Sequence, residues 1–312
     1  MSRCGSWRTA CAALALLGAL AQPCLADADQ AKPAPATLRG ATPEVAVGPQ
    51  YDTTHVYVAP GSLDSFVRSF VATFGGKPSP QQEANVLPVP SKTKMQYVWT
   101  PVGTLSVFEF LTPLPYPFGA ERNGFLVRDM DQAVEAARTS GAELLVAPFK
   151  DPIGLDAVIQ WDGGVKMQLY WHYKAPQYDA LESVPENRVY ISPDRADVFL
   201  RGYALFSHGK VVEDDKNADG AEIGQDGGHY RRVRMESAFG KTLVLVSNGH
   251  LPYPYGREIT GYEVTDLDAT LDKARAAGAA ILVNARDVAD RRSAMVQFPG
   301  GYIAEIHAPR AK

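Results

Sequence analysis

The side chains that could do chemistry in this chain are histidines, carboxylates and arginines. The cysteines, Cys4, Cys11 and Cys24, all lie close to the N-terminus. The rest of the chain therefore has no thiol for disulfides, thiolate catalysis or metal binding. No serine–histidine–aspartate pattern, glycine-rich phosphate loop or dinucleotide fingerprint stands out. Glu305 and His307 lie two residues apart in an apolar run, which predicts that both side chains lie on the same face of one strand.

The first residues have the pattern of a secretory signal peptide. Arg3 and Arg8 precede an apolar run over residues 10–21, and Cys24-Leu25-Ala26 offers small residues before a cut at Asp27. The alternative is a retained membrane anchor, but a spanning helix needs about 20 apolar residues. We expect residues 1–26 to be removed and the mature protein to be periplasmic or secreted.

Composition limits the partners of the mature chain. Residues 27–50 are rich in Ala and Pro without apolar periodicity, which predicts a disordered tether. The net charge is −4 and there is no basic block. We therefore expect no nucleic acid partner and no membrane contact after cleavage, with a monomer or a homodimer as the assembly.

An internal repeat organises the chain from residue 54 onward. The segment Leu114–Gly119 reads LPYPFG, and Leu251–Gly256 reads LPYPYG. This offset of 137 residues continues without a gap to Gly141 and Gly278. Upstream, the segments 55–60 and 188–193 match at an offset of 133 residues. A match of this length indicates a duplicated unit.

Each half divides again into two modules. In the second quarter, Phe125 and Val127 alternate as in a strand, and a helix is expected from Asp131 until Gly141. Apolar runs then follow at 144–146, 157–159 and 165–171. The same order appears in the other quarters, so the chain is predicted to be α+β, with four βαβββ modules.

The module sequences resemble a known superfamily. Residues 261–268 (GYEVTDLD), 274–279 (ARAAGA) and 300–307 (GGYIAEIH) are similar to the glyoxalase/bleomycin resistance/extradiol dioxygenase family, the vicinal oxygen chelate superfamily. The resemblance implies that modules pair into two glyoxalase-like cups of curved sheet, formed by residues 51–178 and 184–309. It also implies that a small molecule binds on a concave face.

Metal-dependent members of the family take ligands from an opening strand and from a last strand. The resemblance assigns four such positions to each cup. The positions in the first cup are His55, Val107, Arg122 and Gln168, and those in the second are Arg188, Val244, Ile259 and Glu305. Val and Ile cannot coordinate, and a guanidinium repels a cation. Neither cup therefore has the three ligands that a catalytic divalent metal usually has, and no cofactor is expected.

Three arrangements would still hold a divalent metal, which would be Zn, Fe, Mn or Ni. His55, Glu109 and Gln168 could form a reduced site in the first cup. Glu305 and His307 could bind a metal between them. A swapped pairing of the first and fourth modules would unite His55 with Glu305.

The arginines at two ligand positions favour a different chemistry. Arg122 and Arg188 could grip a carboxylate or phosphate through parallel hydrogen bonds. The alternative is that they form internal ion pairs, with Glu109 and Glu305 as the candidate partners. The other expected ligand-binding residues are Tyr57, Tyr190, Gln168 and Tyr170.

The sequence therefore favours an exported protein that binds a small anionic or aromatic molecule in a cup whose metal site has degraded. Any catalysis would be proton chemistry with His55 or Glu305 as the base. One alternative is a metal-dependent glyoxalase-like lyase or dioxygenase. The second alternative is a non-catalytic interaction scaffold.

Overall fold

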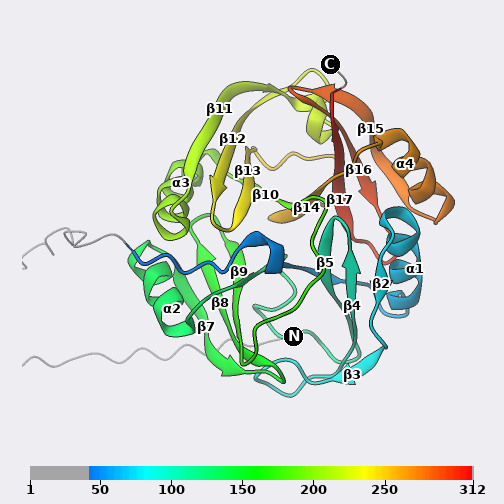
Figure 1. Cartoon of the computed structure of the whole chain (residues 1–312). Helices are drawn as coiled ribbons and strands as arrows, with labels where there is room; N and C mark the ends of the chain where they lie inside the picture. Colours follow the sequence, from blue (N-terminus) through cyan, green and yellow to red (C-terminus); the bar gives the residue numbers. More distant parts are fainter. Residues whose placement is uncertain (1–41, 311–312) are drawn as a thin grey trace, which may run out of the picture. The chain divides into compact units, whose positions relative to one another are not determined.

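A computed structural model describes residues 42–310, which form one compact unit (Figure 1). The predicted signal peptide and residues 27–41 of the tether lie outside the described residues. Residues 42–50, which we expected to belong to the disordered tether, instead contact the fold. Ala46 forms a β-bridge with Val127, and both residues are buried. The apolar side chains of Val45 and Ala46 explain this difference, because they complete a core cluster.

The first half of the unit contains two βαβββ modules. The first is β1 (Thr53–Tyr57), α1 (Leu63–Phe74), short β2 (Lys77–Pro78) and β3 (Gln82–Ala84), β4 (Thr93–Thr100) and β5 (Gly103–Phe110). The second is β6 (Asn123–Leu126), α2 (Met130–Thr139), β7 (Glu143–Lys150), β8 (Gly154–Trp161) and β9 (Val165–His172).

The second half repeats this order. Its first module is β10 (Glu186–Ile191), α3 (Pro193–Ser207), β11 (Lys210–Asp219), β12 (His229–Ser237) and β13 (Gly240–Val246). The last module is β14 (Glu258–Glu263), α4 (Leu267–Ala276), β15 (Ala280–Val288), β16 (Arg291–Gln297) and β17 (Ile303–Pro309). The predicted α+β fold with four modules is confirmed.

The modules pair in sequence order to make two curved sheets. In residues 42–310 the first sheet has the order β2-β4-β5-β1-β6-β9-β8-β7, and the second has the order β11-β12-β13-β10-β14-β17-β16-β15. In each sheet the opening strands of two modules meet antiparallel at the centre, as β1 with β6 and β10 with β14. The swapped pairing is therefore wrong, because His55 and Glu305 belong to different sheets.

The repeated sequence sets the same local structure in two modules. The Asp129 side chain caps α2 by accepting a hydrogen bond from the Gln132 backbone N–H, and Asp266 caps α4 through Ala269, both at 2.9 Å. Such caps satisfy a backbone donor that the first helical turn leaves unpaired. The helices therefore begin at equivalent positions and leave the strands on either side in equivalent registers.

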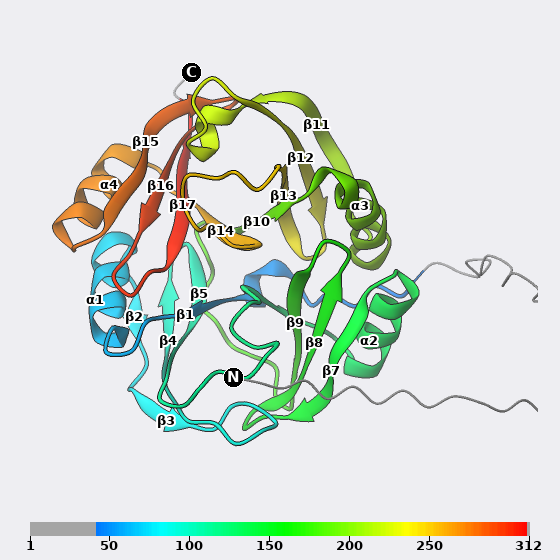
Figure 2. The same cartoon turned by 180° about the vertical axis from the view of Figure 1, so that it is seen from behind.

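The helices pack where modules of different sheets meet (Figures 1 and 2). Helix α1 lies beside α4, and one core cluster joins the first module to the last. A second cluster joins the two middle modules, with α3 packed against β8. Phe66 and Phe70 of α1 are fully buried, and loss of such a ring costs about 3–5 kcal/mol. This packing on the outer faces leaves the concave faces to form the two cups. Within the described residues, no helix is both long and apolar enough to cross a membrane.

Candidate functional site

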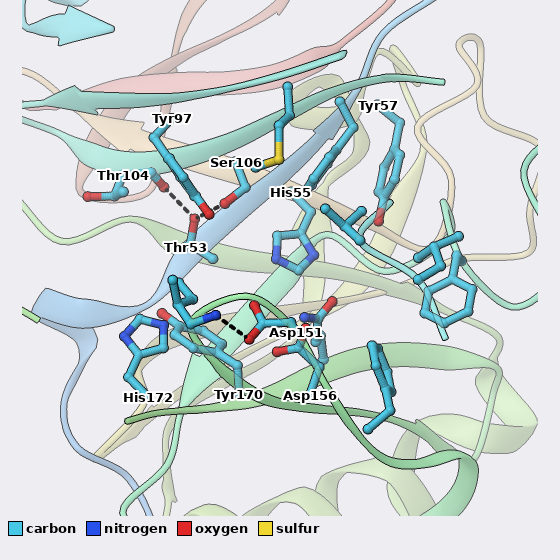
Figure 3. Close-up of a pocket in the computed structure, with 18 of the residues that line it drawn as sticks. Thr53, His55, Tyr57, Tyr97, Thr104, Ser106, Asp151, Asp156, Tyr170 and His172 are labelled. Atoms are coloured by element: carbon cyan, nitrogen blue, oxygen red, sulfur yellow. Dashed lines mark hydrogen bonds between the residues drawn. The ribbon is translucent and has the colours of Figure 1, made fainter. Parts of the chain in front are cut away.

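The concave face of the first sheet lines an open cavity (Figure 3). The lining side chains come from β1, β4, β5, β7, β8 and β9 and from the segments between them. The empty space between these side chains, including the open solvent at the mouth, is about 760 Å³. The sheet curves around this space, so residues from both modules face one another across it.

Aromatic rings form most of the wall. Tyr57 and Phe108 stack with their ring centroids 5.4 Å apart, on neighbouring strands β1 and β5. These side chains share one face because alternate residues of a strand point the same way. The aromatic lining residues are Tyr57, Tyr97, Phe108, Phe110, Phe118, Phe149, Tyr170 and Tyr178. Such a wall suits a flat, apolar ligand.

His55 projects from β1 into this cavity, as predicted for a site residue (Figure 3). Its ring lies against Gly124 of β6, where an added Cβ would be only 2.8 Å from the imidazole Nε2. Its Nδ1 is buried without a hydrogen-bond partner among the described residues and lies 3.9 Å from Glu121 Oε1. Burial, and then the charge of Arg122, lower the pKa of His55 to about 3. The imidazole is therefore neutral at pH 7 and is a weak base.

Two carboxyl groups that we did not predict lie in the same cavity. Asp156 of β8 is 7% exposed and Asp151 precedes β8, and both line the cavity (Figure 3). Burial, followed by repulsion from Asp151, raises the pKa of Asp156 to about 8, although a hydrogen bond with Gln168 opposes the shift. Asp151 is held in place because its Oδ1 accepts hydrogen bonds from the backbone of Ile153 and Gly154. At pH 7 the Asp156 carboxyl is therefore mostly protonated.

The structure brings three other predicted ligand-binding residues to the cavity. Tyr57, Gln168 and Tyr170 all line it with His55. The Tyr57 hydroxyl donates to the Glu121 carboxylate, and the Tyr170 hydroxyl donates to the backbone carbonyl of Tyr51. These bonds direct both hydroxyls into the protein. The aromatic rings, and not the hydroxyl groups, therefore face the cavity and can contact a ligand.

Arg122 lies behind the cavity wall instead of inside the cup. Its Nη1 donates to the backbone carbonyl of Gly119 at 2.9 Å, and its Cζ lies 5.4 Å from the centroid of the Tyr57 ring. It is absent from the described residues that line the cavity. Its charge reaches the site only through the ring of Tyr57 and through its effect on the pKa of His55.

The expectation that Glu109 points into the first cup is wrong. Glu109 is buried on the opposite face of β5, and its Oε2 accepts a hydrogen bond from the backbone N–H of Leu63 at 2.9 Å. There it satisfies an N–H at the start of α1, and the helix dipole favours its negative charge. Within residues 42–310 it is an ion-pair partner of neither Arg122 nor Arg188.

The second cup holds a buried charge network. Arg188 has no exposed surface, and its guanidinium lies 3.3 Å from Glu186, 3.2 Å from Glu222 and 3.7 Å from Glu305. Glu305 also accepts from Ser293 at 2.5 Å and bonds His307 Nδ1 at 2.7 Å. The internal pairing of Arg188 with Glu305, which was the alternative to ligand binding by Arg188, is therefore present.

This network fills the second cup around Arg188 and Glu305, and the pocket that Tyr190 lines lies instead against residues 247–257. Glu305 is fully buried and its pKa is lowered, because the neighbouring His307 and Arg188 outweigh the effect of burial. Tyr190 stacks on Tyr255 at 5.3 Å inside the cup. Apolar side chains fill the remaining space. They are Ala218, Ile223, Tyr230, Leu243, Leu245, Ile259, Val283, Met295 and Ile303.

Strand register corrects two of the assumed metal positions by one residue. Gly124 and Gly261 pair with Gln168 and Glu305 in the second and fourth modules. The equivalent pairs in the other modules are Tyr57 with Phe108 and Tyr190 with Leu245, so Val107 and Val244 are not the equivalents. In β5 and β13 the equivalent residue lies five residues after the glycine instead of four, so counting four residues selected the opposite face of the strand.

The corrected sets do not fit a divalent metal. The first cup has His55, Phe108, Arg122 and Gln168, and the second has Arg188, Leu245, Ile259 and Glu305. Each set contains one strong ligand, whereas a catalytic metal needs about three. No group of three or more His, Asp or Glu side chains in the described part of the chain is arranged to hold a metal.

Comparisons with known proteins agree on the fold. No protein-family model matches the sequence, and no curated protein is a significant sequence match. A mutant of 4-hydroxymandelate synthase from Streptomyces coelicolor has a TM-score of 0.57 at 14% identity, covering 86% of this chain and 94% of that one. A variant of homoprotocatechuate 2,3-dioxygenase from B. fuscum has a TM-score of 0.55 at 14% identity, covering 87% of this chain and 73% of that one.

A third similar structure is a fusion of a xylose isomerase-like TIM barrel with 4-hydroxyphenylpyruvate dioxygenase. It has a TM-score of 0.56 at 12% identity, and the match covers 89% of this chain and 51% of that one. The chain therefore has the two-cup fold of the vicinal oxygen chelate superfamily, as the sequence resemblance predicted. At these identities the likeness describes the fold alone.

Proposed function

We propose that this protein binds a small aromatic molecule in its first cup and none in its second. The difference between the two concave faces carries the proposal. Ser106 and Phe108 of the first cup occupy the positions of Leu243 and Leu245 in the second. Ser106 borders the open cavity, whereas Leu243 fills its cup.

The aromatic class follows from the wall of the cavity. Rings on several strands enclose the space, and His55 and Gln168 supply polar groups that can orient a ligand. The names of the similar structures also refer to aromatic compounds, namely 4-hydroxymandelate, homoprotocatechuate and 4-hydroxyphenylpyruvate. The expected preference for an anion loses its support, because Arg188 is enclosed by carboxylates and Arg122 lies behind the wall.

The metal-dependent lyase or dioxygenase remains the alternative, and its support is the fold of the similar structures. The residues at the metal-ligand positions of this chain argue against the metal-dependent alternative, since each cup has one side chain there that coordinates a metal strongly. We derive no catalytic step through a metal. His55 is a poor general base because its pKa is far below 7, and buried Glu305 cannot reach a ligand.

The binding of 2-phenylethanol to the purified mature protein, measured by calorimetry, tests the proposal. The Ser106→Leu variant places in the first cup the leucine that the second cup has at the equivalent position, and it should abolish binding. Ser106→Ala is the matched control, since it removes the hydroxyl that hydrogen-bonds Thr53 at 3.2 Å but keeps the space. Equal binding by both variants would place the ligand elsewhere. If no simple aromatic compound bound the native protein, the interaction scaffold would be the better explanation.

The cellular compartment of the protein is proposed from the sequence alone. The basic, apolar and small-residue regions at the start predict export and cleavage before Asp27. Mass spectrometry of the exported protein should find Asp27 as the first residue. An intact N-terminus on cytoplasmic protein would contradict this proposal without affecting the binding site.

A further inference from the structure

We infer that the ligand of the first cup is an aromatic amine whose ammonium group lies between Asp151 and Asp156. This inference rests on the proposed function and adds the charge of the ligand. It is drawn from the two carboxyl groups, the aromatic walls and the absence of lysine and arginine among the described residues that line the cavity.

The two carboxyl groups lack a cationic partner. Neither Asp151 nor Asp156 forms an ion pair with any residue in the described range 42–310. Asp156 is more than nine-tenths buried, and ionising a buried carboxyl without a counter-charge is costly. A ligand that supplied a positive charge would remove that cost. An anionic ligand would increase it.

The second cup shows how the same fold satisfies buried carboxylates. There Arg188 extends from β10 and is surrounded by Glu186, Glu222 and Glu305. The repeat places His55 at the position of Arg188 in the first cup. His55 is neutral at pH 7, and burial also lowers the pKa of His172, the other histidine of the cavity. Among the described residues, the lining of the first cup therefore has acidic groups but no cation. The ligand would supply the charge that Arg188 supplies in the second cup.

The walls of the cavity suit a cation as well as an aromatic ring. The faces of Tyr and Phe rings attract ammonium groups, and the attraction is stronger where water is excluded. Tyr97 of β4 and Tyr170 of β9 line the cavity with Asp156 (Figure 3). The rest of the wall, including Phe108 and Phe110, remains available to the apolar part of the ligand.

Binding of an amine should change the protonation of the site. The pKa of Asp156 is raised to about 8, first by burial and then by Asp151. An ammonium group beside it favours the ionised form and lowers that pKa. At pH 7 the complex should therefore release a proton, whereas a neutral ligand should release none.

A matched set of three probes tests the inference. The probes are 2-phenylethylamine, 2-phenylethanol and phenylacetate, which differ in charge at a similar distance from the ring. Calorimetry at pH 7 in buffers of different ionisation enthalpy gives both the affinity and the number of protons released. We expect the amine to bind about tenfold or more tightly than the alcohol, since charge-assisted hydrogen bonds are about twice as strong as neutral ones. Phenylacetate should bind most weakly.

Two variants locate the effect. Asp156→Asn keeps the shape but removes the charge, so it should abolish both the preference for the amine and the proton release. The circular dichroism spectrum of the variant shows whether it is folded. Asp162→Asn, just beyond the other end of β8, is the control and should behave as the native protein.

The outcomes separate this inference from the proposed function. Binding of the alcohol or of phenylacetate as tightly as the amine would overturn the inference and leave the aromatic site intact. Retention of the amine preference in Asp156→Asn would overturn it as well. If none of the three probes bound, the proposed function would fail and the inference with it.

Discussion

Arg188 and Glu305 lie 3.7 Å apart at the floor of the second cup, and neither has exposed surface. Both stand at positions where the family resemblance implies metal ligands. Here Arg188 lies among three carboxylates, and Arg232 and Arg291 also pair with two of them, so the charge of the cup is balanced from within. No arginine or lysine lines the first cup within residues 42–310, and its cavity is open. The two halves of one duplicated chain have thus diverged in charge and in packing.

Removal of the Arg188 side chain should destabilise the protein strongly. Arg188→Ala leaves the buried Glu305 without a guanidinium partner, whereas Glu186 keeps Arg291 at 3.2 Å and Glu222 keeps Arg232 at 2.9 Å. Breaking a buried pair in this way costs about 3–5 kcal/mol. Urea denaturation measures the loss, and Arg188→Met serves if the alanine variant does not fold. The exposed Arg195 pairs with Asp162 at 3.6 Å, and Arg195→Ala should cost less than about 1 kcal/mol. Equal effects at the two sites would contradict the role given to Arg188.

The Asp156→Asn variant should change how stability depends on pH. The folded state raises the pKa of Asp156 from 3.8 to about 8, so folding retains a proton that the unfolded chain releases. This contribution to stability is complete below pH 3.8 and is lost as pH rises to about 8. The free energy of unfolding of the variant relative to the native protein should therefore rise by about 1.4 kcal/mol per pH unit in this window. A difference that stays constant from pH 4.5 to pH 8 would show that Asp156 titrates normally.

The His55 ring should remain neutral across the whole range from pH 5 to pH 8. Its pKa is lowered from 6.5 to about 3, first by burial. Because this pKa is depressed, the stabilising contribution is present above pH 6.5 and is lost as pH falls towards 3. Imidazole ¹⁵N shifts measure the charge, and a His55→Gln variant assigns the signal. A His55 signal that moved with a midpoint near 6.5 would contradict the buried position.

Metal content should not depend on His55. The corrected ligand positions in each cup provide one strong ligand, so we expect the mature protein, purified without chelators, to carry no stoichiometric Zn, Fe, Mn or Ni. Elemental analysis of the native protein and of His55→Ala should give the same background. Stoichiometric metal that is lost in His55→Ala would overturn the binding-site account and favour the metal-dependent alternative.

The duplication made much of the fold predictable from sequence. The residues that fix where helices begin, such as the capping residues Asp129 and Asp266, recur at a constant offset in the sequence. Residues 42–50 were assigned wrongly, since their composition resembles a linker and only packing against the middle modules orders them.

The site was predicted in part. His55, Tyr57, Gln168 and Tyr170 meet in the first cup, but Asp156 was missed. The signal that could have found it is its offset of 137 residues from Ser293, which lies beside Glu305 in the second cup. What sequence could not show is which cup is filled, because Leu243 and Ser106 both satisfy the strand pattern. The volumes of the side chains that face one another across the sheet decide which cup is filled. Which side chains face one another depends on the register of strands that are far apart in the chain.

One measurement tests the central claim, that the first cup binds a ligand and the second does not. Met95 lines the first cavity and Met295 lies in the filled second cup. In protein labelled with ¹³C at the methionine methyl groups, titration with 2-phenylethylamine should shift the Met95 signal saturably and leave the Met295 signal unchanged. A Met295 shift as large as that of Met95, or no shift at Met95 at saturating ligand, would contradict the claim.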